Sequence, residues 1–306
     1  MEKIKKTVII TGYDCNNFCR FCINSNKRDI PIKNTAQIIS EMKIARKNGS
    51  TYLELIGGEV TIRDDVLLLF QYAKKLGFKT IMIATNGRMF SYFDFAKKSI
   101  EAGLNHIVFS IHGHNDKLHD FLTQAPGSFD QLVKGINNFK KLGFKNLGTN
   151  TTVVKQNYKF LPAIAKLIFD MGIKNSEYIF VDPTYGAAYD NFNKFVPKIS
   201  TTAPYFKKVL DFARKKRISD WTVRYVPLCY FQKYKNYISE LREVKNFSTQ
   251  HLAPDFVNKD VSESRKNIAR AKPKRCKKCV LYNQCEGVWK EYLKYYGDKE
   301  LKPILK

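Results

Sequence analysis

Short runs of β-branched and aromatic residues alternate with longer amphipathic segments over the first two thirds of the chain. Apolar residues at helical spacing predict helices at about 35–48, 65–76, 92–102, 129–142, 159–171 and 205–216. The short runs predict strands at about 7–12, 52–56, 79–84, 106–111, 150–154 and 177–181. Several predicted helices are followed directly by a glycine that would cap them, as at Gly77, Gly103, Gly143 and Gly172.

Strand–helix units in strict alternation predict an α/β fold with a parallel sheet and right-handed crossovers. A doubly wound sheet and a curled, partial barrel both satisfy this order. No Gly-x-Gly-x-x-Gly follows the first strand, which disfavours a dinucleotide-binding fold. Polar residues instead follow successive strands, and a barrel gathers such loops at one mouth. The pattern therefore favours the partial barrel.

Composition narrows the class of protein. A chain of 306 residues can form one barrel-sized domain and a small appendage. It contains no signal peptide and no apolar run of roughly 20 residues, so we expect a cytoplasmic protein without a membrane span. The net charge of +25 would attract nucleic acid, an acidic peptide or a phosphorylated ligand, although solvated lysines on helices would explain it equally well.

Three of the seven cysteines, Cys15, Cys19 and Cys22, crowd the loop after the first predicted strand. Seven cysteines in a cytoplasmic protein indicate metal or redox chemistry rather than disulfides. Three thiolates this close can hold three corners of a [4Fe–4S] cube and leave one iron open to a small molecule. A zinc site and unrelated core cysteines are the alternatives.

The Cys-x3-Cys-x2-Cys spacing, with Phe21 before the last cysteine, resembles the radical S-adenosylmethionine (radical SAM) enzymes. The resemblance implies a partial (β/α)6 TIM barrel, here over residues 1–218, and SAM bound at the open iron. An electron donor such as flavodoxin or ferredoxin would reduce the cluster. SAM is then cleaved to a 5′-deoxyadenosyl radical that abstracts a substrate hydrogen.

The same resemblance implies roles for residues after the other strands. Gly57-Gly58-Glu59 resembles the element in which a carboxylate, here Glu59, holds the amino group of SAM. Contacts with the methionine, ribose or adenine are implied for Asn86, Ser110, Asn150, Thr152 and Val181, with turn or cap roles as alternatives.

Further polar residues after the fourth and sixth strands suggest substrate contacts. His112, His114 and His119 are not expected to bind metal, because cysteines already account for the iron. Asp182 and Tyr185 are candidate catalytic residues, as substrate contacts or as proton or hydrogen donors; Tyr189 is a similar candidate.

The remaining cysteines form a second group. Cys276-x2-Cys279-x5-Cys285 resembles the auxiliary-cluster domains of the SPASM type and of its shortened Twitch relative, here over residues 219–306. Trp289 stands where the SPASM pattern has a fourth cysteine. Cys229 would complete a second [4Fe–4S] cluster, or it would donate a hydrogen atom to a substrate radical. A zinc site is the structural alternative, and residues 235–258 are predicted as a polar linking segment.

The resulting hypothesis is a radical SAM enzyme that modifies a peptide or peptide-like substrate. The first predicted strand begins at about residue 7, so no separate leader-binding domain is expected before the barrel, which counts against a standalone peptide maturase. The basic run 265–278 favours a nucleoside or RNA instead. A sugar or cofactor precursor is a further alternative, and a non-catalytic iron–sulfur or zinc nucleic-acid-binding protein is the alternative from another class.

Overall fold

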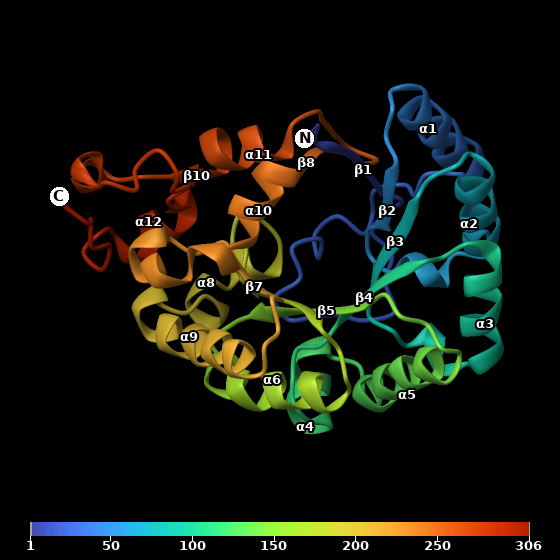
Figure 1. Ribbon diagram of the computed structural model, residues 1–306, viewed down its shortest axis with the longest axis horizontal. Helices are drawn as coiled ribbons and strands as arrows, with labels where there is room; N and C mark the ends of the chain where they lie inside the picture. The colour runs from blue at the N-terminus through green and yellow to red at the C-terminus, as the bar shows by residue number, and fades with distance from the viewer. Residues whose placement is uncertain (1, 306) are drawn as a thin grey trace.

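A computed structural model describes residues 2–305, which form a curved sheet with helices on its outer face (Figure 1). The sheet has nine strands in the order β7-β6-β5-β4-β3-β2-β1-β8-β9, and β7 and β9 are its open edges. The strands of this sheet are β1 (Ile4–Ile10), β2 (Tyr52–Ile56), β3 (Thr80–Thr85), β4 (His106–Ser110), β5 (Leu147–Val153), β6 (Asn175–Phe180), β7 (Asp220–Arg224), β8 (Phe247–Leu252) and β9 (Val257–Asn258). Neighbours from β7 through β8 are parallel, and β9 is antiparallel to β8.

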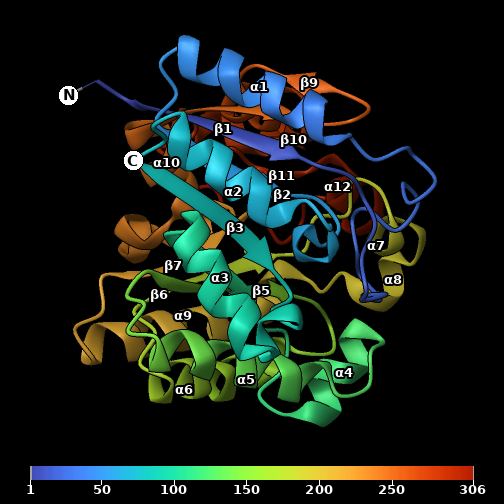
Figure 2. The same cartoon turned by 90° about the vertical axis from the view of Figure 1, so that its right-hand side faces the viewer.

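Helices cover the outer face in chain order, and Figure 2 shows α1, α2 and α3 side by side there. The main helices are α1 (Thr35–Lys47), α2 (Val66–Lys75), α3 (Phe93–Ala102), α4 (Asp116–Thr123), α5 (Ser128–Lys141), α6 (Leu161–Asp170), α9 (Ile199–Lys215) and α10 (Ser239–Asn246). Shorter elements are α7 (Ala187–Asp190), α8 (Phe192–Phe195), α11 (Val261–Ser264), α12 (Lys290–Tyr296) and the separate hairpin of β10 (Arg270–Ala271) and β11 (Val288–Trp289). Within residues 2–305, no helix combines the length and apolar character needed to cross a membrane.

The predicted open barrel of strand–helix units is confirmed, and every predicted strand and helix has its counterpart. The core lies between the sheet and the helices, where Phe90, Phe109 and Phe139 pack edge to face with ring centroids 4.9–6.2 Å apart. Gly77, which directly follows α2, has a φ of +79°, and the equivalent glycines after α3, α5 and α6 also have positive φ. The expected glycine caps are therefore confirmed.

Two strands of the parallel part of the sheet lie where the sequence predicted none. The predicted alternation stopped at Asp220, but residues 220–224 form β7 and pair with β6. The prediction that 235–258 is a linking segment is wrong, because α10 and β8 lie within it and β8 pairs with β1. β8 is mostly polar, and one of its polar side chains finds its partner on β1: Gln250 Nε2 donates to Thr7 Oγ1 at 2.9 Å. The sheet thus runs across the predicted domain boundary at 218, which itself stays a prediction.

Buried ion pairs join the C-terminal segment to the sheet. Arg270 Nη1 lies 3.0 Å from Glu240 Oε1 and 3.2 Å from Glu286 Oε2, and the Arg270 and Glu240 residues are only 2% and 3% exposed. Arg224 of β7 pairs with Glu177 of β6 at 2.8 Å. Part of the basic run 265–278 therefore faces internal carboxylates rather than a partner.

Arg270→Ala should remove the charge that compensates Glu240 and lower the free energy of unfolding by about 3–5 kcal/mol, since breaking a buried pair leaves an isolated charge. Arg275→Ala is the matched control, because Arg275 is 42% exposed and its nitrogen lies 3.8 Å from Asp298. It should change stability by less than about 1 kcal/mol. Denaturant unfolding measures both, and equal effects would contradict the role given to the buried network.

Candidate active site

The cysteine loop follows β1 and is held by backbone contacts on both sides. At its outer side, Phe18 and Arg20 donate their N–H groups to the carbonyl oxygens of Thr123 and Leu122, each at 2.9 Å. Arg28 ties the loop to itself, because its guanidinium donates to the Cys15 carbonyl at 3.2 Å. The carbonyls at 122 and 123 belong to the end of α4, a helix that the sequence analysis did not predict.

Cys15, Cys19 and Cys22 line one cavity of about 250 Å³. Burial raises the pKa of all three thiols, that of Cys15 to about 11, while the Arg28 guanidinium acts in the opposite direction. The thiols are therefore protonated at neutral pH until a metal displaces the protons. The structure thus brings together the three cysteines that the sequence singled out.

The donor set of this cavity can be compared with what each metal group requires. Across residues 2–305, no three His, Cys, Asp or Glu side chains are placed to share a single metal ion. Zinc gathers its ligands around one ion, whereas each thiolate on an iron–sulfur cube binds a different iron. Three soft sulfur donors in one loop therefore fit a cluster better than zinc.

The Gly57-Gly58-Glu59 turn after β2 packs directly against the cysteine loop. Gly58 N–H donates to the Gly12 carbonyl at 2.9 Å, and Glu59 N–H donates to the Asp14 carbonyl at 2.7 Å. A Cβ atom on Gly58 would lie 1.9 Å from the Asp14 oxygen, and one on Gly57 would lie 2.2 Å from the Gly12 oxygen. The sequence analysis explained these glycines by approach to a ligand; in the structure they are needed for approach to the chain itself.

Glu59 points its carboxylate into the same cavity and is held rigidly there. Oε1 accepts from the hydroxyls of Thr61 and Thr85 at 2.6 and 2.7 Å and from Thr61 N–H at 3.1 Å, while Oε2 accepts from Asn86 N–H at 2.6 Å. Burial raises the pKa of Glu59, and these hydrogen bonds oppose that change. A fixed carboxylate beside the cysteines can pair with a ligand ammonium group.

Asn86 and Ser110, for which contacts with SAM were predicted, also line the cavity. Asn86 Nδ2 donates to Asn16 Oδ1 at 2.7 Å and lies 3.8 Å from the sulfur of Cys15. Phe21 is buried behind the loop, with its ring 4.9 Å from that of His112. Other predicted contacts lie outside the cavity lining, namely Asn150, Thr152 and Val181.

Several lining residues were not predicted as SAM contacts, among them Tyr13, Arg28, Glu54 and His112. Glu54 pairs with Lys6 inside the barrel. Burial alone would raise the pKa of Glu54, but the positive charge of Lys6 has the larger effect and lowers it. The sequence signal for Glu54 is its position on β2, where alternate side chains face the inside of the sheet.

The loop after β6 covers the cysteine loop. Ala187 N–H donates to the Cys22 carbonyl at 2.9 Å, and a Cβ atom on Gly186 would lie 2.4 Å from the Ile23 oxygen. Asp182 lies in this loop, and burial raises its pKa to about 6. The contacts place the loop beside the cysteines, although Asp182 does not line the cavity itself.

Tyr185, in the same loop, stacks under the Lys27 ammonium at 4.7 Å from the ring centroid. Burial raises its pKa to about 12, so its hydroxyl stays protonated. Lys27 also pairs with Asp255 at 2.8 Å, which joins the cysteine loop to the segment between β8 and β9. Tyr185 thus takes part in the contacts that connect the loops at the barrel mouth, but it does not line the cavity.

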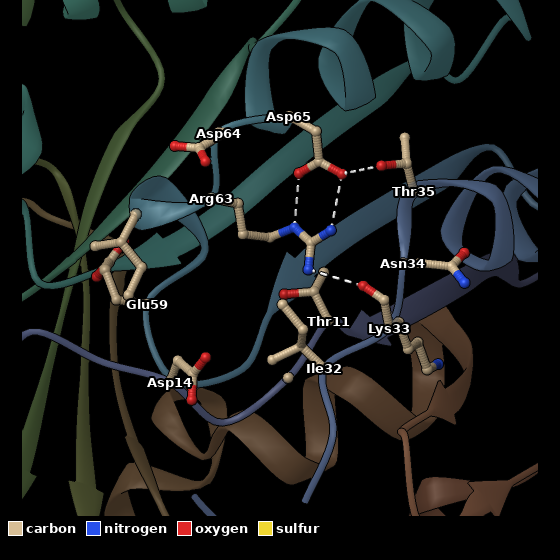
Figure 3. Close-up of a pocket in the computed structure, with 13 residues that line it drawn as sticks. Thr11, Asp14, Ile32, Lys33, Asn34, Thr35, Glu59, Arg63, Asp64 and Asp65 are labelled. Atoms are coloured by element: carbon tan, nitrogen blue, oxygen red, sulfur yellow. Dashed lines mark hydrogen bonds and ion pairs between the residues drawn. The ribbon is translucent and has the colours of Figure 1, made fainter.

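A second cavity, of about 460 Å³, lies beside the Glu59 turn and contains no cysteine (Figure 3). Arg63 makes most of the hydrogen bonds among its lining residues: its guanidinium donates to both oxygens of Asp65 at 2.8 Å and to the Lys33 carbonyl at 3.0 Å. Thr35 adds a hydrogen bond to Asp65 at 2.6 Å. These hydrogen bonds connect the start of α1 with the residues that follow Glu59, and they stabilise the position of the Gly57-Gly58-Glu59 turn.

The C-terminal cysteines also come together. Burial raises the pKa of Cys276 to about 11, and the nearby thiols of Cys229, Cys285 and Cys279 raise it further. All four are partly buried, and Trp289 is buried in β11. The candidate fourth ligand therefore lies near the other three although about 50 residues separate it from them in sequence.

Backbone N–H groups point at the sulfurs of this second group. Cys285 Sγ accepts from Leu228 and Gly287 at 3.5 and 3.3 Å, and Cys279 Sγ accepts from Ile304 at 3.4 Å. Such bonds stabilise thiolates and shift the reduction potential of bound clusters. The donor set fits an iron–sulfur cluster.

Comparison with known proteins gives sequence relatives over somewhat more than half of the chain. The chain is 28% identical over 176 residues to a probable GTP 3′,8-cyclase of Saccharolobus solfataricus, which is 57% of this chain and 56% of the relative. It is 31% identical over 172 residues to an Fe-coproporphyrin III synthase of Methanosarcina barkeri, covering 55% and 42%. The matches thus span about half the length of these curated relatives.

Solved structures resemble nearly the whole chain in fold. Streptococcus suis SuiB bound to its precursor peptide SuiA matches with a TM-score of 0.70 at 17% identity, over 96% of this chain and 73% of SuiB. The structure of anSMEcpe with bound AdoMet and a peptide matches with a TM-score of 0.68 at 14% identity, covering 99% and 93%. The model of the radical SAM superfamily matches residues 9–168. The chain therefore belongs to the radical SAM superfamily, whose members are enzymes that use SAM and a [4Fe–4S] cluster.

Proposed function

We propose that Cys15, Cys19 and Cys22 hold the SAM-binding [4Fe–4S] cluster and that the cavity beside them binds SAM. The observation that carries this proposal is that three thiols and the fixed carboxylate of Glu59 open onto one cavity. Bound together, the cluster and SAM supply a 5′-deoxyadenosyl radical that abstracts a hydrogen from the substrate.

The surrounding residues bind, orient and shield in this proposal. Glu59 pairs with the ammonium of SAM, and its hydrogen bonds keep the carboxylate in one orientation before binding. Asn86 and Ser110 offer further polar contacts, and Arg28 adds positive charge that favours thiolates. The loop after β6 limits the access of water to the reacting atoms.

Residues 219–306 carry a second, auxiliary [4Fe–4S] cluster in this proposal, held by Cys229, Cys276, Cys279 and Cys285. Support comes from the closeness of the four thiols and from the N–H groups that point at two of them. The rival role of Cys229 is hydrogen donation to a substrate radical, which would leave three cysteines on the auxiliary cluster. The electron donor would be a small carrier such as flavodoxin or ferredoxin.

The substrate that we favour is a peptide or peptide-like molecule. Both solved structures described above contain peptides, and their likeness in fold covers 96% and 99% of this chain. Asp182 would act near the mouth as a proton donor or acceptor, because its pKa of about 6 lies close to neutral pH. Tyr185 would contact the substrate as a protonated phenol.

A nucleoside or nucleotide substrate is the second candidate, because the chain is similar to a probable GTP 3′,8-cyclase. The charge of the basic run supports RNA binding less than the sequence suggested, since Arg265 and Arg270 pair with internal carboxylates. An RNA substrate requires binding that weakens steeply with salt.

Glu59→Gln should weaken SAM binding by at least about tenfold, because the amide cannot neutralise an ammonium and faces donors on every side. Glu41→Gln is the control, since Glu41 pairs with Lys33 near α1 and lines neither cavity. The dissociation constant of SAM is measured on protein with its cluster. Unchanged affinity in Glu59→Gln would remove Glu59 from the SAM site.

Cys229→Ala should lower the iron content from about eight to about four per chain and leave a cluster that still responds to SAM. Cys19→Ala is the matched variant, and it should lose the SAM response while keeping the other cluster. Iron analysis and the cluster spectrum distinguish the two. Full iron content in Cys229→Ala would show that Cys229 is not a ligand and would favour hydrogen donation.

A further inference from the structure

His112 is a buried polar side chain in the SAM cavity, for which the sequence suggests only a contact with substrate. It follows β4, is 5% exposed, and lines the cavity together with the three cysteines, Glu59 and Ser110. A buried imidazole needs partners for both ring nitrogens, or a ligand that supplies one. The partners of its nitrogens therefore decide what it can do.

The hydrogen bonds of His112 fix its tautomer. Thr152 N–H donates to Nδ1 at 3.3 Å, and a backbone N–H can only donate, so Nδ1 carries the lone pair. The proton of the neutral ring is then on Nε2. Burial lowers the pKa of His112 to about 3, which agrees with a neutral ring. His112 thus presents one N–H donor.

The ring is also fixed in place. The backbone N–H of His112 donates to His119 Nδ1 at 3.2 Å, and its carbonyl accepts from Asn157 Nδ2 at 3.0 Å. The ring meets Phe21 of the cysteine loop edge to face at 80°. Among residues 2–305 the structure gives Nε2 no acceptor, but this atom is not fully enclosed by protein, so an acceptor on a ligand in the cavity can reach it.

We propose that His112 donates its Nε2–H to an oxygen of SAM bound in this cavity. This rests on the proposed function, because it takes the cavity to be the SAM site. SAM offers two kinds of oxygen that a neutral donor can meet, those of the methionine carboxylate and those of the ribose. In either case His112 is a binding residue that helps to orient SAM at the cluster, and the edge contact with Phe21 couples its position to the cysteine loop.

The test compares variants of the cluster-loaded protein by their SAM dissociation constants. His112→Phe keeps an aromatic ring but has no donor, and should bind SAM about tenfold more weakly. His112→Gln keeps an N–H donor and should stay within about threefold of the parent. His114→Gln is the control on the same loop: it does not line the cavity, and it should bind SAM normally.

Two product fragments separate the possible acceptors. With methionine as the probe, weaker binding only in His112→Phe assigns the carboxylate; with 5′-deoxyadenosine as the probe, the same result assigns the ribose. If His112→Phe loses its iron, His112→Met and His112→Gln are compared instead, since one lacks and the other retains a donor. Equal SAM affinity with and without the donor overturns the proposal. Loss of SAM binding by the parent protein would instead overturn the proposed function.

Discussion

The site depends on the contact between the backbone of the cysteine loop and the turn after β2. Two N–H donors of that turn bind the carbonyls of Gly12 and Asp14, and the chains approach so closely that neither Gly57 nor Gly58 has room for a Cβ atom. The pairing of β1 with β2 fixes how close the two chains come, because the cysteine loop continues directly from β1 and the Gly57-Gly58-Glu59 turn continues directly from β2. The cysteines and Glu59 therefore reach the same cavity as a consequence of backbone geometry.

Ion pairs hold the C-terminal segment against the rest of the barrel. β7 and β8 extend the two sides of the sheet. Arg224 of β7 pairs with Glu243 of α10, and the arginines at 265 and 270 pair with carboxylates of α10 and of the chain just before β11. Tyr13 donates to Asp255, which also pairs with Lys27, so the end of β8 is fastened to the cysteine loop. The proposed auxiliary cluster would thus lie in a segment whose position is fixed by charge pairs as well as by packing.

Sequence patterns predicted the elements that repeat and the motifs that cluster locally. The six strands from β1 to β6 stand out because each is a short run rich in β-branched, aromatic or other apolar residues between amphipathic helices. The spacing of Cys15, Cys19 and Cys22 indicates its chemistry without the fold. β8 could not be predicted, because residues 248–251 are polar and form no apolar run; one of them, Gln250, pairs with Thr7 of β1. The help that α4 gives the cysteine loop was missed for a similar reason, since it uses backbone carbonyls that carry no sequence signal.

The central claim is that this chain binds SAM at a cluster held by its first three cysteines. The most direct measurement is anaerobic incubation of reconstituted protein with SAM and dithionite, followed by assay of 5′-deoxyadenosine and of the cluster spectrum. The account predicts 5′-deoxyadenosine and a spectrum that changes when SAM is added, both absent when Cys15, Cys19 and Cys22 are replaced by alanine. A fully loaded parent protein that yields neither signal would contradict it.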